Sequence, residues 1–312
     1  MRRLIALVAV VMVALTLTVR AAQPIAYVTE IQRSGGDVQV RASGEQEWTT
    51  PRPLLALSAG DQVRVTGQAR LVVLYHADAR TVTVTAANSP VTITPAPDTL
   101  RGEQVRVLTA AVTQFFMTKQ NAPQLRQAAT RGDNVLIVSP RHTRLLPGPV
   151  VFEWEGPEQL RYGVRVVGPE GTVWTQAGLP RTPLRYPTTA PLLSAGVRYT
   201  WELEIPGRGR QSTSFEIVAD ADAARIRAGL AALDRATDGY PRTTVALMQA
   251  AVLYEEGLFA DARRALEEAA SEDPREATVR FVLGHVYDQI GLGLKASRAF
   301  DEASDLITAT GR

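Results

Sequence analysis

Near its C-terminus the chain repeats itself. The stretch from Leu253 to Ala269 recurs 34 residues later, from Tyr287 to Ala303, and the two copies agree at seven of seventeen positions. Most of the shared residues are small or apolar: Gly257/Gly291, Leu258/Leu292, Ala262/Ala296, Arg264/Arg298, Ala265/Ala299, Glu268/Glu302 and Ala269/Ala303. Small residues let two helices approach closely, and a glycine closes the turn between them. The period therefore predicts two helical hairpins that stack on one another.

This region resembles the tetratricopeptide repeat, a helical hairpin with small and aromatic residues at set positions. The second copy matches at Leu283, Gly284, Tyr287, Gly291, Ala296, Phe300 and Ala303. The first matches at Gly257, Ala262, Leu266, Ala269 and Pro274, with Leu253 where tyrosine and Ala250 where glycine is usual. The resemblance implies an all-α tetratricopeptide hairpin array over residues 222–312, with a degenerate half-repeat before the first full copy.

In this family, set positions of each first helix line a groove that holds peptides or helices of other proteins. Carried over to this chain, the positions are Thr244, Leu247, Ala251, Tyr254 and Glu255, then Thr278, Phe281, His285, Asp288 and Gln289. The alternative is that some of them pack against the β-sandwich that precedes the repeats. We also expect an uncapped surface near Leu294, Phe300 and Leu306, open to the β region, to a partner or to a second copy in a homo-oligomer.

The N-terminus has the pattern of an export signal. Two arginines precede an uncharged apolar run from Leu4 to Val19, and small residues follow at Ala21 and Ala22. We predict a signal peptide over residues 1–21 and a periplasmic protein. If the segment is not cleaved, it anchors the chain to the inner membrane with the rest outside. The chain has no cysteine, which excludes a lipoprotein anchor and disulfides.

Residues 25–100 alternate apolar and polar side chains in short runs, which predicts a small β-sandwich or barrel. One continuous apolar run, Leu71–Tyr75, indicates a strand buried on both faces. The region resembles the FecR-type periplasmic β domain, whose Gly-Asp turn is matched by Leu57, Gly60, Asp61, Val63, Val65 and Thr66. Signalling members carry a cytoplasmic region before their membrane segment. Only three residues precede the apolar run here, so direct control of a sigma factor is not expected.

Residues 103–133 predict a helical linker of one or two helices, because Val105, Leu108, Val112, Phe115 and Phe116 lie near helical spacing. We expect it to pack on the first β region or to bridge to the next. Residues 134–218 predict seven short strands in a Greek-key sandwich. They resemble a fibronectin type III domain, a fold of the immunoglobulin-like kind, at Trp154, Leu193, Gly196 and Tyr199.

Charge argues against a nucleic-acid partner. Without residues 1–21, the chain has 31 basic and 32 acidic residues. No stretch has the density of lysine and arginine that neutralising many phosphates requires. Export would also separate the protein from nucleic acid.

No motif for catalysis, a cofactor or a metal is evident. His76, His142 and His285 lie in three different regions without metal-ligand spacing. The Gly291–Ala296 stretch fits the dinucleotide-binding pattern G-x-G-x-x-A, but it falls in a predicted helix–helix turn and does not follow a strand. The tripeptide Arg131–Asp133 is similar to the integrin-binding sequence, and we interpret it instead as a turn in the linker. Asp220 and Asp222 fit a solvated helix start better than a cation site. Of Trp154, Trp174 and Trp201, the second is the one most expected to be exposed, where a sugar could stack.

The sequence therefore predicts a multidomain chain with two all-β domains and a helical array. We expect an exported, non-enzymatic scaffold of the bacterial cell envelope that binds a protein partner through the repeats. Two alternatives stay open. One is an envelope ligand sensor that uses the FecR-like domain, and the other is a cell-wall glycan-binding protein that uses Trp174.

Overall fold

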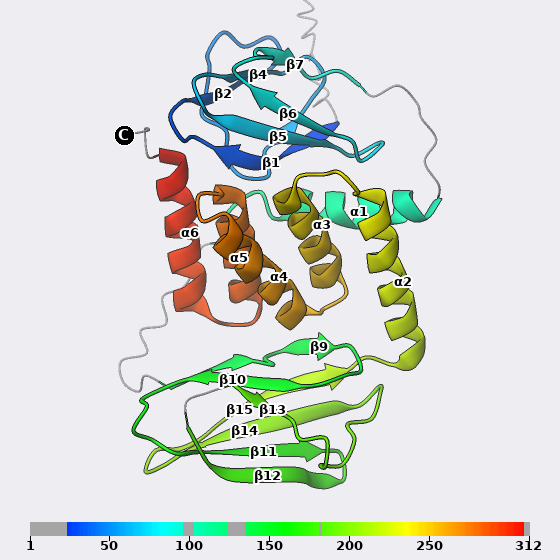
Figure 1. Ribbon diagram of the computed structural model, residues 1–312, viewed down its shortest axis with the longest axis vertical. Helices are drawn as coiled ribbons and strands as arrows, with labels where there is room; N and C mark the ends of the chain where they lie inside the picture. The colour runs from blue at the N-terminus through cyan, green and yellow to red at the C-terminus, as the bar shows by residue number, and fades with distance from the viewer. Residues whose placement is uncertain (1–23, 96–102, 124–134, 181–182, 309–312) are drawn as a thin grey trace, which may run out of the picture.

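The computed structural model describes residues 24–95, 103–123, 135–180 and 183–308, with the side chains of residues 103–109 left out. The described residues form three layers (Figure 1). A first β region, residues 24–95, lies at one end, and a second β region, residues 135–218, lies at the other. The helical layer between them contains the C-terminal helices and a helix from between the two β regions. Both β regions therefore contact the same helices.

The first β region is a sandwich of two sheets. One has the strand order β3-β1-β5-β6 and the other β2-β4-β7. The strands are β1 (Ala26–Gln32), β2 (Val38–Arg41), β3 (Ala56–Leu57), β4 (Gln62–Val65), β5 (Arg70–Tyr75), β6 (Thr81–Thr85) and β7 (Val91–Thr92). Alternating valines of β2 and β4 fill the space between the sheets. The apolar run in β5 is buried on both faces, as its sequence predicts, because its outer face packs on the helices.

A β-bulge in β1 decides which of its side chains face the helices. The register with β5 shifts between Val28 and Glu30, so Thr29 is the extra residue. Before the bulge, Val28 faces the core of the sandwich; after it, Ile31 does. A side chain alternates between faces along a regular strand, and one inserted residue reverses that alternation. The bulge thus places Ile31 in the core and turns Glu30 toward the helices, where it bonds to α3.

The second β region also has two sheets, in the orders β12-β11-β14-β15-β9 and β13-β10-β8. Its strands are β8 (Leu136–Ser139), β9 (Thr143–Leu145), β10 (Val151–Glu155), β11 (Tyr162–Gly168), β12 (Gly171–Leu179), β13 (Leu184–Arg185), β14 (Arg198–Ile205) and β15 (Gly209–Ile217). Large aromatic side chains fill the core, among them Phe152, Tyr162, Trp201 and Phe215. Seven of the eight strands were predicted; β9, which pairs in parallel with β15, was not.

The helical layer contains α1 (Glu103–Thr118), α2 (Asp220–Ala236), α3 (Arg242–Glu255), α4 (Phe259–Glu272), α5 (Ala277–Gln289) and α6 (Gly293–Thr308). Helices α3 and α4 form one antiparallel hairpin and α5 and α6 a second, packed side by side as the repeat predicts (Figure 1). The hairpin helices approach closely at Gly284, where an added Cβ would lie 2.7 Å from the Phe300 ring. Pro274 lies in the turn between the two hairpins.

The prediction for residues 103–133 is confirmed for its first helix. Helix α1 contacts the first β region through Phe116 and Tyr27, whose ring centroids are 5.8 Å apart. It also packs on α2 and α3, which the sequence did not predict. The second possible helix, and the Arg131–Asp133 tripeptide, lie outside the described residues, as does the predicted signal peptide.

Candidate partner-binding surface

The two copies of the repeat build the same turn. Gly257 and Gly291 follow α3 and α5 with φ angles of 74° and 75°, a conformation that favours glycine. In each copy the next residue donates its N–H to a carbonyl five residues earlier, Leu258 to Leu253 and Leu292 to Tyr287, at 2.8 Å in both. These bonds satisfy carbonyls that the helix end would otherwise leave unpaired. The shared glycine therefore has a definite structural role.

We use the term groove face for the eight positions that the sequence assigned most directly to partner binding. They differ in exposure. Four of them, Leu247, Ala251, Phe281 and His285, are buried. Tyr254 is half-buried, and Glu255, Asp288 and Gln289 are exposed. The exposed residues all lie in the last turn of α3 or α5, at equivalent positions of the two repeats, and the Tyr254 hydroxyl lies 2.8 Å from Gln289 Oε1.

Helix α1 covers part of the groove face. The Phe115 ring packs edge-on against Tyr254, with 5.0 Å between centroids, and the Lys119 Nζ lies 4.8 Å from the same ring. Leu247 and Ala251 share one buried apolar cluster with Phe115. The groove face is therefore covered at Tyr254, but the covering element is α1 and not the second β region that the alternative named.

His285 is enclosed by apolar rings. Its own ring lies 4.9 Å from Phe281 and 5.0 Å from Phe300. Burial, followed by the charge of Lys119, lowers the pKa of His285 to about 4, although a backbone hydrogen bond with Lys119 acts in the opposite direction. A neutral imidazole at physiological pH packs well among these rings, so His285 is a core residue here.

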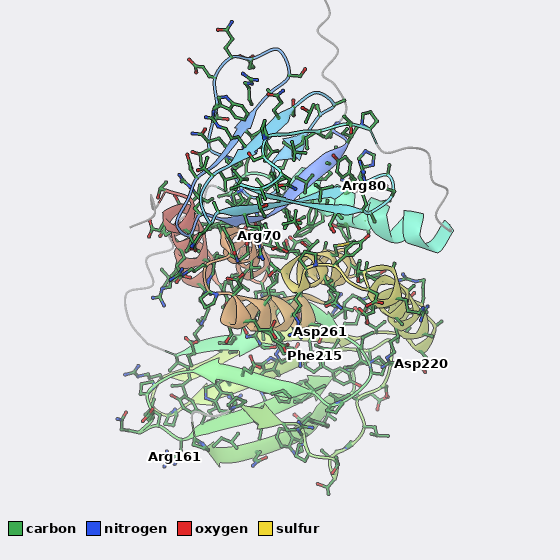
Figure 2. All side chains as sticks on the ribbon, turned by 45° about the horizontal axis from the view of Figure 1, so that its top comes forward. Arg70, Arg80, Arg161, Phe215, Asp220 and Asp261 are labelled. Carbon is green, nitrogen blue, oxygen red and sulfur yellow. The ribbon has the colours of Figure 1, made fainter. Side chains whose placement is uncertain are left out.

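The N-terminal end of α3 receives a carboxylate from the first β region. Its N-cap residue is Pro241, which offers no capping side chain. Glu30 of β1 supplies one instead: its Oε1 accepts from the Thr244 backbone N–H at 3.1 Å and the Thr244 hydroxyl at 2.7 Å. The other oxygen of Glu30 accepts from Arg70 at 2.8 Å. Figure 2 shows Arg70 where the first β region meets the helices. Glu30 is fully buried and joins the two layers.

The N-terminal end of α5 has its own carboxylate. Glu276 Oε1 accepts from the Thr278 backbone N–H at 3.1 Å and, across the interface, from the Ile31 backbone N–H at 2.9 Å. Glu276 is fully buried, and its Oε2 has no hydrogen-bond partner. Burial above all raises the pKa of Glu276 from 4.5 to about 8, and the nearby Glu30 adds to the rise. At neutral pH Glu276 is therefore mostly protonated.

The C-terminal ends of the same helices receive arginines from the second β region. Arg144 donates its backbone N–H to the Gly257 carbonyl at 2.8 Å and its guanidinium to the Glu256 carbonyl at 3.1 Å. Arg141 donates to the Ile290 carbonyl at 2.6 Å. Glu256 and Ile290 are the C-cap residues of α3 and α5. A cation is favoured at a helix C-terminus and an anion at its N-terminus, so Glu30, Arg141 and Arg144 each have the charge that the helix end they meet attracts.

A second set of charged contacts joins the second β region to the helices. The buried Arg263 of α4 pairs with Glu153 and Glu267. Lys295 of α6 pairs with Glu155 at 2.7 Å. Burial, and the hydrogen bond to Glu267, raise the pKa of the Tyr287 hydroxyl well above its ordinary value. Beside this network is a cleft of about 350 Å³ between the second β region and the start of α4, where Figure 2 labels Asp261.

The other residues that the sequence singled out pack against neighbouring side chains or form ion pairs. Trp154 and Trp201 are core residues, and the Trp201 indole N–H donates to the Pro140 carbonyl at 2.7 Å. Trp174 is half-buried, packed edge-on against Tyr186. Asp222 in the first turn of α2 pairs with Arg144 and Arg225. Within the described ranges, no group of three or more His, Asp or Glu side chains could hold a metal ion.

Sequence reasoning missed the residues that join the layers, namely Glu30, Glu276, Arg141 and Arg144. One signal was available for Glu30. In the stretch Ala26–Gln32, a regular alternation would place this carboxylate on the same face as Ala26 and Val28. A charge at an apolar position of a buried strand indicates either a bulge or a buried partner.

No protein-family model and no curated protein matches the chain. In the part of the chain that the structure describes, no helix has the length and apolar character needed to cross a membrane. The predicted N-terminal signal lies before that part.

Proposed function

We propose that this chain is an exported, non-enzymatic scaffold of the bacterial cell envelope that binds a protein partner through its C-terminal helices. The proposal treats α3 to α6 as two tetratricopeptide-type repeats, and the flanking regions as FecR-type and fibronectin type III-like modules that hold them. The N-terminal sequence supports the proposed periplasmic location.

One observation carries this proposal. The exposed part of the groove face lies in the last turns of α3 and α5, where Tyr254 and Glu255 in one repeat are equivalent to Asp288 and Gln289 in the next. The Tyr254–Gln289 hydrogen bond joins the two repeats at this surface. Two carboxylates beside an aromatic ring favour a partner with basic and apolar side chains.

The test uses charge reversal on the full mature chain. We would compare protein captured from crosslinked envelopes of the bacterium that makes the chain, using wild type and the double variant Glu255→Arg, Asp288→Arg. The matched control is Asp301→Arg, Asp305→Arg, two exposed carboxylates of α6.

We expect the first double variant to lose a specific protein that wild type and the control both retain. Capture of the same proteins by all three chains would contradict the proposal and direct attention to the β regions. Deleting the helices is a poorer test, because it would expose the apolar side of β5 and the buried Glu30.

A further inference from the structure

The described apolar side chains of helix α1 meet the rest of the helical layer by packing, and a backbone hydrogen bond between Lys119 and His285 adds one polar contact just after the helix. Along the chain, the whole second β region lies between α1 and α2, yet α1 lies across α2 and α3 (Figure 1). Among the side chains of α1 that the structure describes, Val112, Phe115 and Phe116 are buried, each at most 1% exposed. Met117, on the opposite side, is 50% exposed. The spacing i, i+3, i+4 gives α1 a single apolar face, the arrangement by which a helix binds in a groove.

The buried face of α1 meets the groove face through Phe115 and Tyr254, and Lys119 lies over the same tyrosine ring. Val112, Phe115, Phe116 and Lys119 thus form the series i, i+3, i+4, i+7. The basic residue stands close to the exposed end of the groove face, where Tyr254 is hydrogen-bonded to Gln289.

The kind of contact distinguishes α1 from the two β regions. Strand β1 and residues 141–145 are joined to helix ends by directional hydrogen bonds. Glu30 accepts from Thr244, and Ile31, Arg141 and Arg144 donate. The described side chains of the α1 apolar face meet their neighbours through ring and apolar packing. Apolar packing depends on shape and area rather than on paired donors and acceptors. Another helix with the same side-chain pattern would therefore fit this surface.

We propose that α1 is a resident ligand of the groove face, and that a partner using this face presents an amphipathic helix in competition with α1. That helix carries bulky apolar side chains at i, i+3 and i+4 and a basic residue at i+7. Because a tethered ligand has an effective concentration on the order of millimolar, α1 excludes weak competitors. The inference rests on the proposed function and names the chemistry of its partner.

The test supplies α1 in trans. The probe is a fluorescent peptide with the sequence of residues 103–120, and its control is the same peptide with Phe115→Ala and Phe116→Ala. Each is titrated by anisotropy into three full-length mature proteins: wild type, the Phe115→Ala, Phe116→Ala variant, and Met117→Ala. The last variant changes the exposed side of the same helix.

We expect the double variant to bind the native-sequence peptide saturably, and the control peptide at least about tenfold more weakly, as loss of buried aromatic anchors predicts. Wild type and Met117→Ala, whose groove face is occupied, bind neither. The inference is overturned if the folded double variant binds neither peptide, or if wild type binds the native-sequence peptide as tightly as the variant does.

A more conservative variant keeps the inference testable if the double alanine protein does not fold. Phe115→Leu, Phe116→Leu keeps apolar side chains but loses the ring contacts. With excess peptide, we expect faster hydrogen exchange at the α1 amides of this variant and not at those of β5. Unchanged α1 exchange would overturn the inference. A negative result in these peptide and exchange experiments does not affect the envelope-capture test with Glu255→Arg, Asp288→Arg. The two proposals can therefore fail independently.

Discussion

The two faces of the helical layer differ in the sign of the charge that joins them to the β regions. At the first face, the buried Glu30 carboxylate meets the N-terminal end of α3, and the buried, mostly protonated carboxyl group of Glu276 meets that of α5. At the second, Arg144 and Arg141 meet the C-terminal ends of the same helices. Glu30, Arg141 and Arg144 each carry the charge that the helix dipole favours at that helix end.

The difference between the faces is one of burial and protonation. Glu30 and Glu276 are fully buried, whereas the Arg144 side chain is 31% exposed. Burial raises the pKa of Glu276 to about 8, so this carboxyl group changes its protonation state in ordinary buffers, whereas a guanidinium stays charged. We therefore expect the carboxylate face to be the stronger and the more pH-dependent of the two.

The largest effect is expected from Glu30→Ala. The substitution leaves the buried Thr244 N–H without an acceptor and removes the partner of Arg70. Leaving a buried donor without an acceptor costs about 1–3 kcal/mol, and both the N–H and the hydroxyl of Thr244 lose Glu30, so the free energy of unfolding should fall by about 3–5 kcal/mol in urea titrations. The Arg70 side chain, which is 36% exposed, adds little to this loss. Glu30→Gln, which retains an acceptor oxygen, should lose less than half as much. Equal losses in the two variants would show that the acceptor for α3 contributes little.

The next effect is a pH dependence from Glu276. Its pKa is higher in the folded state, at about 8, than the ordinary 4.5, so the folded protein holds the proton more tightly. The stabilisation is fully present below pH 4.5 and is lost as the pH rises to about 8. We expect this group to lower the free energy of unfolding over that window by on the order of 4 kcal/mol.

Urea titrations between pH 5 and pH 9 measure this effect, with Glu276→Gln as the comparison. The uncharged amide should flatten the dependence over the same window. A wild-type profile that is already flat, or a glutamine variant with the wild-type slope, would contradict the role assigned to Glu276.

A smaller effect is expected from Arg144→Ala at the second face. It removes one hydrogen bond to the Glu256 carbonyl and two ion pairs that are partly exposed. We expect a loss of about 1–2 kcal/mol, equal at pH 6 and pH 9. The control is Arg161→Ala, an exposed arginine on the outer side of the second β region (Figure 2), which should change stability by less than about 0.5 kcal/mol. A pH-dependent Arg144 effect would remove the contrast between the faces.

The smallest effect on stability is expected at the exposed end of the groove face. Glu255→Arg and Asp288→Arg change surface side chains that belong to neither interface, so each should shift the free energy of unfolding by less than about 0.5 kcal/mol. Thermal unfolding would show this directly. A large loss of stability in either variant would mean that the residue stabilises the fold. The variant could then not be used to test partner binding.

Local patterns in the sequence predicted the elements well and their contacts poorly. The repeat predicted the hairpins, and the apolar run in β5 predicted burial on both faces. The three-residue strand β9 was missed because it lies in a charged, proline-flanked stretch without a strand-like alternation. Its pairing with β15 and its arginine neighbours depend on the tertiary fold.

The candidate surface shows the same limit. Helical spacing identified Val112, Phe115 and Phe116 as one apolar face, but spacing does not say what covers that face. The covering residues lie far away along the chain, among them Tyr27 of β1 and Tyr254 of α3. Glu276 looked like an ordinary surface charge before α5, and its burial depends on β1.

The most direct test of partner binding is site-specific photo-crosslinking in living cells, with the crosslinker at Asp288 in one chain and at Asp301 in another. Both positions are exposed on the helical layer, the first on the groove face and the second on α6. The account predicts a discrete crosslinked protein at Asp288 and none at Asp301. A protein crosslinked at Asp301 alone, or at neither position, would contradict a partner bound at the groove face.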